Sequence, residues 1–216
     1  MVEPVLTVTP AFAAPIGEGR LPGCERLNQE LEALFLAREN DEFRNPTPSH
    51  LPQQELFESR FNLFSWPEAC VRELRAVVLT AIVQVVRQVS GTPPETLAAL
   101  TMQNHTWFHI TRYGGAFVAH NHPLASWSAV YCVRAGEAVA EQPLSGMLRF
   151  FDPRTGANAY QDPANADLQP AYSVGVRNFR LAAGQIVVFP SYLYHEVAPF
   201  YGRDTRITVA TNCWFR

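Results

Sequence analysis

Two histidines one residue apart raise the question of metal chemistry in this chain. His120 and His122 stand in VAHNHPLASW, directly before Pro123. In a β-strand, residues i and i+2 point to the same face, so a strand ending here would present both imidazoles on one side. Pro123 cannot donate to a ladder and marks where strand pairing stops. Imidazole is a common metal ligand, but an HxH pair also arises easily by chance, so a metal site and a polar loop both remain open.

A third histidine and an arginine follow much later. His195 lies in GQIVVFPSYLYHEVAPF, after an expected strand, and alone it could equally be a half-buried histidine hydrogen-bonded in a turn. In RITVATN, strand alternation places Arg206 and Thr208 on one face. A guanidinium with a hydroxyl beside it suits binding of a carboxylate, and a buried charge needs such a partner. The alternative is an edge strand with Arg206 in water.

The elements that must position these residues differ along the chain. Residues 23–40 and 65–91 predict helices, and the second has a middle that is apolar nearly all round, typical of a helix lying against a sheet. A short helix could also start at TPPETLAAL. From about residue 101, short β-branched and aromatic runs separated by Gly and Pro turns predict an antiparallel sandwich or barrel.

These patterns predict a mainly β protein. We expect a single domain over residues 1–216, with a mostly helical part over 1–100 packed on one sheet. Residues 101–216 would form a jelly-roll core, the double-stranded β-helix. The 216 residues are 47% hydrophobic and 17% charged, which suffices for one substantial core.

Composition also excludes several classes. A net charge of −3 gives no sign of the basic face that binds nucleic acid. The sequence has no run of 18 apolar residues, so we expect no transmembrane helix. The N-terminal stretch MVEPVLTVTPAFAAPIG lacks a basic start and is broken by prolines, so we expect no signal peptide. Four cysteines without CxxC spacing predict reduced thiols in a cytoplasmic protein.

The HxH pair, the distal histidine and the arginine eleven residues after it resemble Fe(II)- and 2-oxoglutarate-dependent oxygenases, most closely a bacterial subgroup with an HxH…H pattern. The resemblance rests on RYGGAFVAHNHPLASWSAVY, LRFFDPRTG and FPSYLYHEVAPFYGRDTRITVATN. These stretches cover most of residues 107–212. The resemblance implies Fe(II) held by His120, His122 and His195, with 2-oxoglutarate chelating the metal through its keto acid end. It further implies that the distal carboxylate binds Arg206 and Thr208, and more weakly that Tyr113 contacts the cosubstrate.

One departure concerns His122. The wider superfamily has HxD or HxE, which gives two histidines and a carboxylate. Either His122 is a true ligand, or it stands aside and water fills the position. The i, i+2 geometry and the absence of a nearby Asp or Glu favour ligation.

The strand TWFHITRY should place Trp107, His109, Thr111 and Tyr113 on one face. Trp107 and His109 could then wall a substrate pocket, or they could be a core aromatic and a satisfied histidine. The loop over residues 152–170 could be a lid or a solvent-facing turn region.

Three functions remain. The leading one is an iron- and 2-oxoglutarate-dependent hydroxylase acting on a small molecule or peptide. The second is a three-His cupin-like dioxygenase without 2-oxoglutarate, in which Arg206 would hold a substrate carboxylate. The third is a non-enzymatic jelly-roll binding protein. The second helix and the C-terminal NCWFR could support a homodimer or could be core.

Overall fold

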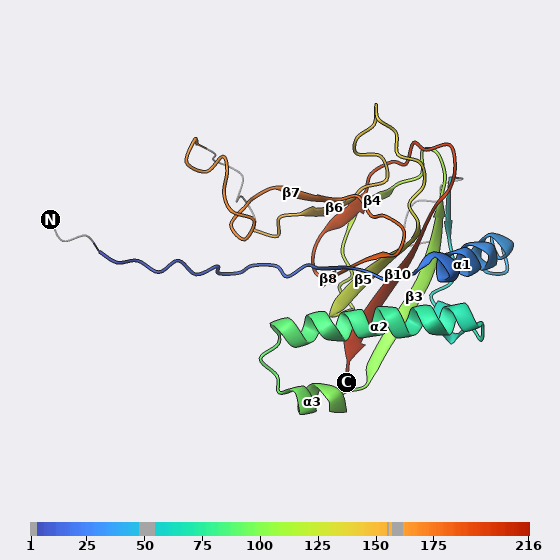
Figure 1. Cartoon of the computed structure of the whole chain (residues 1–216), viewed down its shortest axis with the longest axis horizontal. Helices are drawn as coiled ribbons and strands as arrows, with labels where there is room; N and C mark the ends of the chain where they lie inside the picture. The colour runs from blue at the N-terminus through green and yellow to red at the C-terminus, as the bar shows by residue number, and fades with distance from the viewer. Residues whose placement is uncertain (1–3, 48–54, 155, 157–161) are drawn as a thin grey trace.

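The computed structural model describes residues 4–47, 55–154, 156 and 162–216 (Figure 1). The helices are α1 (Glu25–Ala37), the 3₁₀ turn η1 (Leu63–Ser65), α2 (Ala69–Val89) and α3 (Pro94–Ala99). The strands are β1 (Gly17–Arg20), β2 (Leu56–Glu58), β3 (Met102–Thr111), β4 (Phe117–His120), β5 (Trp127–Arg134), β6 (Leu148–Phe151), β7 (Val176–Phe179), β8 (Gln185–Pro190), β9 (His195–Val197) and β10 (Arg206–Phe215).

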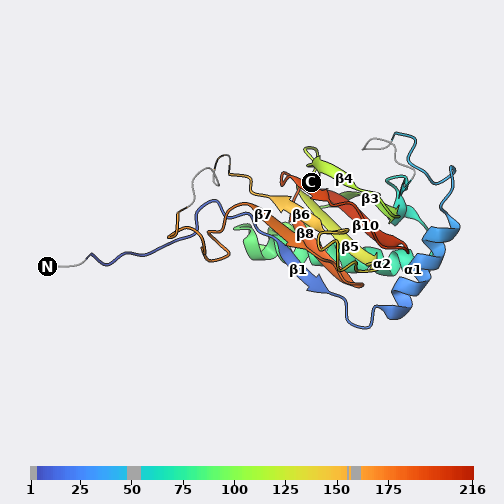
Figure 2. The ribbon, with the colours of Figure 1, turned by 90° about the horizontal axis from the view of Figure 1, so that it is seen from above.

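The strands form two antiparallel sheets. The larger sheet has the order β1-β8-β5-β10-β3-β2, and the smaller has the order β4-β9-β6-β7. Figure 2 shows β1, β8, β5, β10 and β3 side by side in the larger sheet. Neighbours in each sheet are mostly distant in sequence, as in a jelly roll. The prediction of a mainly β fold is therefore confirmed.

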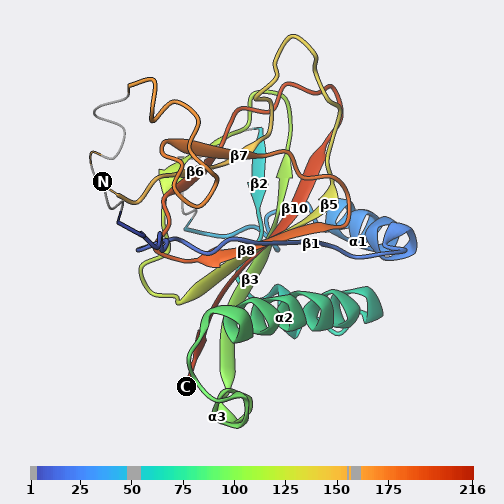
Figure 3. The ribbon, with the colours of Figure 1, turned by 60° about the vertical axis from the view of Figure 1, so that its left-hand side comes forward.

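The two long helices lie on the outer face of the larger sheet, away from β6 and β7 (Figure 3). Helix α1 buries Leu27, Leu31 and Phe35 at helical spacing, and the Phe35 ring stacks on Phe108 of β3 with centroids 4.2 Å apart. Ile110 of β3 belongs to the same core. Since Phe108 and Ile110 face the helices, the odd-numbered residues of β3 face the space between the sheets.

The N-terminal part departs from the expected pattern, because it contributes two strands as well as helices. The segment GEGR forms β1 at the edge of the larger sheet, paired with β8, and LFE forms β2, paired with β3. GEGR has no β-branched or aromatic residue, so its conformation comes from pairing rather than from propensity. Of the helices in the described residues, none combines the length and hydropathy that a membrane span requires.

Candidate functional site

His120 and His195 lie side by side on neighbouring strands of the smaller sheet. His120 ends β4 and His195 begins β9, and the two are direct partners in the ladder with ring centroids 4.4 Å apart. From the Phe117–Val197 pair to the His120–His195 pair, the chain moves three positions along β4 but only two along β9. The extra residue is a β-bulge, a feature that re-aims side chains beside functional sites.

Backbone carbonyls set the tautomer of both rings. His120 Nδ1 lies 2.8 Å from the Val118 carbonyl oxygen, and His195 Nδ1 lies 2.8 Å from the Leu193 carbonyl oxygen. A carbonyl only accepts, so each Nδ1 carries the proton and Nε2 keeps the lone pair that a metal needs. Burial lowers the pKa of His120, which favours the neutral, ligating form.

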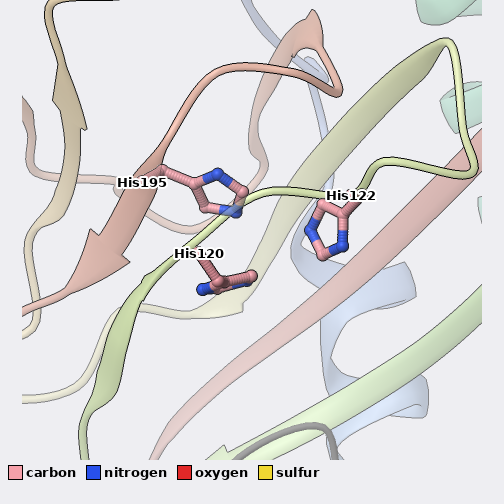
Figure 4. Close-up of side chains that lie close together, drawn as sticks. All are labelled: His120, His122 and His195. Atoms are coloured by element: carbon pink, nitrogen blue, oxygen red, sulfur yellow. The ribbon is translucent and has the colours of Figure 1, made fainter.

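His122 completes the cluster from the loop after β4 (Figure 4). Its backbone N–H donates to the Ser191 carbonyl at 2.9 Å, which ties this loop to the segment before β9. The His122 ring lies 5.0 Å from that of His120 and 5.2 Å from that of His195. One nitrogen from each imidazole lies within 4.8 Å of the others, and no second such group of His, Cys, Asp or Glu occurs in the described part of the chain.

The three histidines line a cavity of about 90 Å³ between the two sheets. Trp107, His109, Arg206 and Thr208 line the same cavity, so the structure brings these predicted residues together with the histidines. Tyr113 lies elsewhere: its side chain is 64% exposed and packs against Tyr201. The strand alternation stops at Thr111, where β3 ends, and the turn at Gly114 carries the chain away.

Arg206 is buried, and the described residues supply no counter-ion for it. Its side chain is 3% exposed, and no carboxylate of the described residues forms an ion pair with its guanidinium. Burial lowers the pKa of Arg206, which reports the cost of keeping this charge out of water. A Cβ added at Gly146 would lie 3.2 Å from Arg206 Cδ and 3.5 Å from Nε, so the arginine packs directly on this glycine. A buried cation with no internal partner fits an anionic ligand.

A second orphaned group adjoins the arginine. Thr111 is the direct ladder partner of Arg206, it is fully buried, and its Oγ1 finds no hydrogen-bond partner among the described residues. Thr208 lies opposite His109 in the same ladder. The cavity therefore joins a trio of imidazoles to a group of donors that suits a carboxylate.

Sequence reasoning missed a carboxylate behind the cavity wall. Glu58 of β2 pairs with His109 in the sheet, and its Oε2 lies 3.2 Å from His109 Nε2. Trp107 Nε1 lies 2.9 Å from the same His109 nitrogen, which either accepts from the Trp107 N–H or donates to Glu58, depending on the tautomer. Asn45 Nδ2 donates to Glu58 Oε1 at 2.7 Å. Glu58 is 5% exposed. No local pattern marks LFE as part of a site, because only its register on β3 brings the carboxylate to His109.

The loop over residues 152–170, for which a lid and a solvent-facing turn region were both open, lies partly outside the described residues. Residues 155 and 157–161 of the 152–170 loop are among those not described. At its start, Arg154 donates to both carboxylate oxygens of Asp152, at 2.9 and 2.7 Å. These bonds hold the pKa of Asp152 below its usual value. Asp152 is thus engaged locally in the turn.

Solved structures of other proteins share this fold. A crystal structure of a Pseudomonas putida prolyl-4-hydroxylase matches with a TM-score of 0.60 and 19% identity, covering 93% of this chain and 91% of that one. HygX from Streptomyces hygroscopicus, with nickel, 2-oxoglutarate and hygromycin B bound, matches with a TM-score of 0.59 and 11% identity, covering 93% and 82%. A prolyl hydroxylase from Trichoplax adhaerens, in complex with a hypoxia inducible factor peptide, matches with a TM-score of 0.58 and 11% identity, covering 92% and 83%. The fold is the double-stranded β-helix of the 2-oxoglutarate oxygenases.

Sequence comparison supplies the family. A family model described as "Putative 2OG-Fe(II) oxygenase" matches residues 105–212, half of the chain. The chain belongs to this family, and it is an enzyme that uses iron and 2-oxoglutarate. The recognition, fold and cofactor predictions are confirmed, and neither the cupin-like enzyme nor the non-enzymatic binding protein is favoured. A search of curated proteins gives no match.

Proposed function

We propose that this protein is a hydroxylase in which His120, His122 and His195 hold Fe(II) and Arg206 with Thr208 binds the distal carboxylate of 2-oxoglutarate. The observation that carries the proposal is the buried, uncompensated guanidinium of Arg206 in the same cavity as the three imidazoles. A dianionic keto acid offers one carboxylate to each end of this cavity. The alternative, a substrate carboxylate at Arg206, leaves the cosubstrate without an anchor.

We assign the third ligand position to His122. Its ring is as close to the other two as a shared ion requires, and no described Asp or Glu joins the cluster. Iron and 2-oxoglutarate, when bound, supply the oxidation of a C–H bond by dioxygen, with succinate and carbon dioxide as co-products. The chain orients both groups and keeps water out with buried walls.

We further propose that Trp107 and His109 form the wall that the substrate meets. Both line the cavity, and Trp107 is held by its bond to His109. Tyr113 stays outside this contact set because of its exposure. The solved relatives hold hygromycin B in one case and a peptide in the other, so a small molecule or a peptide is the proposed substrate class here.

The remaining properties are also proposals. One domain over residues 1–216 is supported by a hydrophobic core that joins α1 and α2 to the larger sheet. A cytoplasmic location is supported by four buried cysteines that are all free. The net charge of −3 argues against a nucleic-acid partner. A homodimer through α2 stays a prediction.

The test is anaerobic titration of Fe(II)-loaded protein with 2-oxoglutarate, monitored by the weak visible charge-transfer band of a chelated keto acid. We expect the band in the natural protein and in Arg87→Ala, a control on the exposed end of α2. Arg206→Ala should need at least about 10-fold more 2-oxoglutarate, since it loses a bidentate charged contact. Bound iron without a band in the natural protein would contradict the proposal and favour the cupin-like alternative.

A further inference from the structure

The orphaned hydroxyl beside Arg206 points to a binding residue that strand alternation alone did not assign. We infer that Thr111 donates a hydrogen bond to the same ligand carboxylate that Arg206 binds. The inference rests on the proposed function, in which that carboxylate is the distal end of 2-oxoglutarate. It adds a contact from β3 to the pair on β10.

The sheet register places Thr111 on the correct face. In the β3–β10 ladder, Thr111 lies directly opposite Arg206, and His109 lies directly opposite Thr208. Directly opposed residues of an antiparallel pair project to the same side. Arg206, Thr208 and His109 line the cavity. Thr111, directly opposite Arg206, therefore lies on the same face of the sheet, next to the cavity lining.

The hydroxyl of Thr111 differs from the other buried hydroxyls nearby. Thr106 Oγ1, on the same strand, is 3.2 Å from Thr211 Oγ1, and Ser128 Oγ is 2.8 Å from Ser191 Oγ. Thr111 is equally buried, yet its Oγ1 has no partner among the described residues. Buried hydroxyls are almost always hydrogen-bonded, so an exception beside an unpaired guanidinium indicates a ligand atom.

Packing keeps the hydroxyl from turning elsewhere. A Cβ added at Gly115 would lie 2.8 Å from Thr111 Cγ2, so the threonine methyl group rests against this glycine. Threonine is stiff about χ1, and fixing the methyl group also fixes the hydroxyl. Arg206 packs against Gly146, where an added Cβ would lie 3.2 Å from its Cδ.

The number of donors matches one carboxylate. An ionised carboxylate has two oxygens with about four lone-pair sites. A bidentate guanidinium from Arg206 occupies two, and one hydroxyl each from Thr208 and Thr111 occupies the others. Without Thr111, one site of a buried anion would stay unsatisfied.

The test is an isosteric pair of variants. Thr111→Val removes the hydroxyl and keeps the shape, and Thr111→Ser keeps the hydroxyl. With anaerobic Fe(II)-loaded protein, Thr111→Val should raise the Kd for 2-oxoglutarate about 10-fold, as expected for one hydrogen bond to a charged group. Thr111→Ser should restore most of the affinity. The melting temperature of ligand-free Thr111→Val should equal or exceed that of the natural protein, because no internal bond is lost.

Two controls locate the effect. Thr106→Val removes a satisfied hydroxyl on the same strand, so it should lower the melting temperature and leave the Kd unchanged. Pyruvate has the keto acid end without a distal carboxylate, so its charge-transfer titration should be the same for Thr111→Val and the natural protein.

The outcomes separate the two proposals. If Arg206→Ala loses 2-oxoglutarate but Thr111→Val binds it normally, the Thr111 contact is wrong and the proposed function stands. A lower melting temperature in ligand-free Thr111→Val would also overturn the inference, since the hydroxyl would then have a partner within the chain. Failure of the natural protein to bind 2-oxoglutarate would overturn both.

Discussion

His120 and His195 lie directly opposite one another across the β4–β9 ladder, and each donates its Nδ1 proton to a carbonyl two residues earlier in the chain. The same local hydrogen bond therefore orients two histidines from distant parts of the sequence. One nitrogen of each of these two rings lies within 4.8 Å of a nitrogen of His122. Backbone geometry thus orients two members of the proposed metal site.

The first prediction concerns the metal. Alanine at His120, His122 or His195 should lower Fe(II) affinity by more than about 100-fold. Mutating a residue that only hydrogen-bonds to a metal ligand already lowers metal affinity by about 10–100-fold. His105→Ala is the control, because His105 lies on β3 against Trp214 and outside the cluster. Metal content after dialysis measures the effect. Full retention of iron in His122→Ala would mean that water fills the third position.

The second prediction uses the uncompensated charge of Arg206. Arg206→Met should raise the unfolding free energy of the ligand-free protein by about 1 kcal/mol or more, because it replaces a buried, unpaired cation by an apolar chain. The same variant should lose the stabilisation that 2-oxoglutarate gives. Urea unfolding with and without the keto acid measures both. A marked loss of ligand-free stability would reveal an internal partner for the guanidinium.

The third prediction compares two glycines with left-handed backbones, Gly146 (φ 63°) and Gly175 (φ 96°). Alanine should cost about 1 kcal/mol at either position, because both carry a positive φ. Only the methyl group at 146 would press on Arg206, since nothing lies within 4 Å of a Cβ at 175. We expect the Kd for 2-oxoglutarate to rise several-fold in Gly146→Ala alone. Equal Kd values for 2-oxoglutarate in the two variants would show that Arg206 can move away from the added methyl group without weakening binding.

The fourth prediction tests the Glu58–His109 contact. A double-mutant cycle of Glu58→Gln and His109→Ala should give a coupling of about 1–3 kcal/mol, because the contact joins two buried groups, one of them charged, away from the screening of water. The exposed pair Arg26 and Glu30 is the control and should show no measurable coupling. Urea unfolding provides the four free energies. A coupling near zero would mean that solvent replaces the contact freely.

The fifth prediction concerns alkaline pH. Burial raises the pKa of Cys132 to about 11 and that of Cys213 to about 12, from a usual value of 9.0. The fold thus keeps protons that the unfolded chain releases, so stability is full below pH 9 and falls as pH rises toward 11. Each thiol adds a slope of at most about 1.4 kcal/mol per pH unit. Urea unfolding between pH 8 and 10.5 measures the slope, which should be shallower in Cys132→Ala. An unchanged slope in that variant would contradict the assignment.

Local pattern was enough for much of this protein. Helical spacing located the two long helices, and the apolar middle of residues 65–91 indicated that the second lies on a sheet, as α2 does. Period-two alternation placed Arg206 with Thr208, and Trp107 with His109, on cavity-facing sides. Side-chain direction within one strand depends only on its own backbone, so the sequence carries this information locally.

Register between distant strands was decided only in the folded molecule. The pairing of His195 with His120 depends on a bulge in β4, and the contact of Glu58 with His109 depends on where a three-residue strand docks. Alternation correctly placed Thr111 on the inner face but extended one step too far, to Tyr113, because β3 ends where its ladder ends. Strand registers and strand ends are set by the packing of the whole core, since a slip of one residue reverses every side chain and only the assembled sheets penalise it.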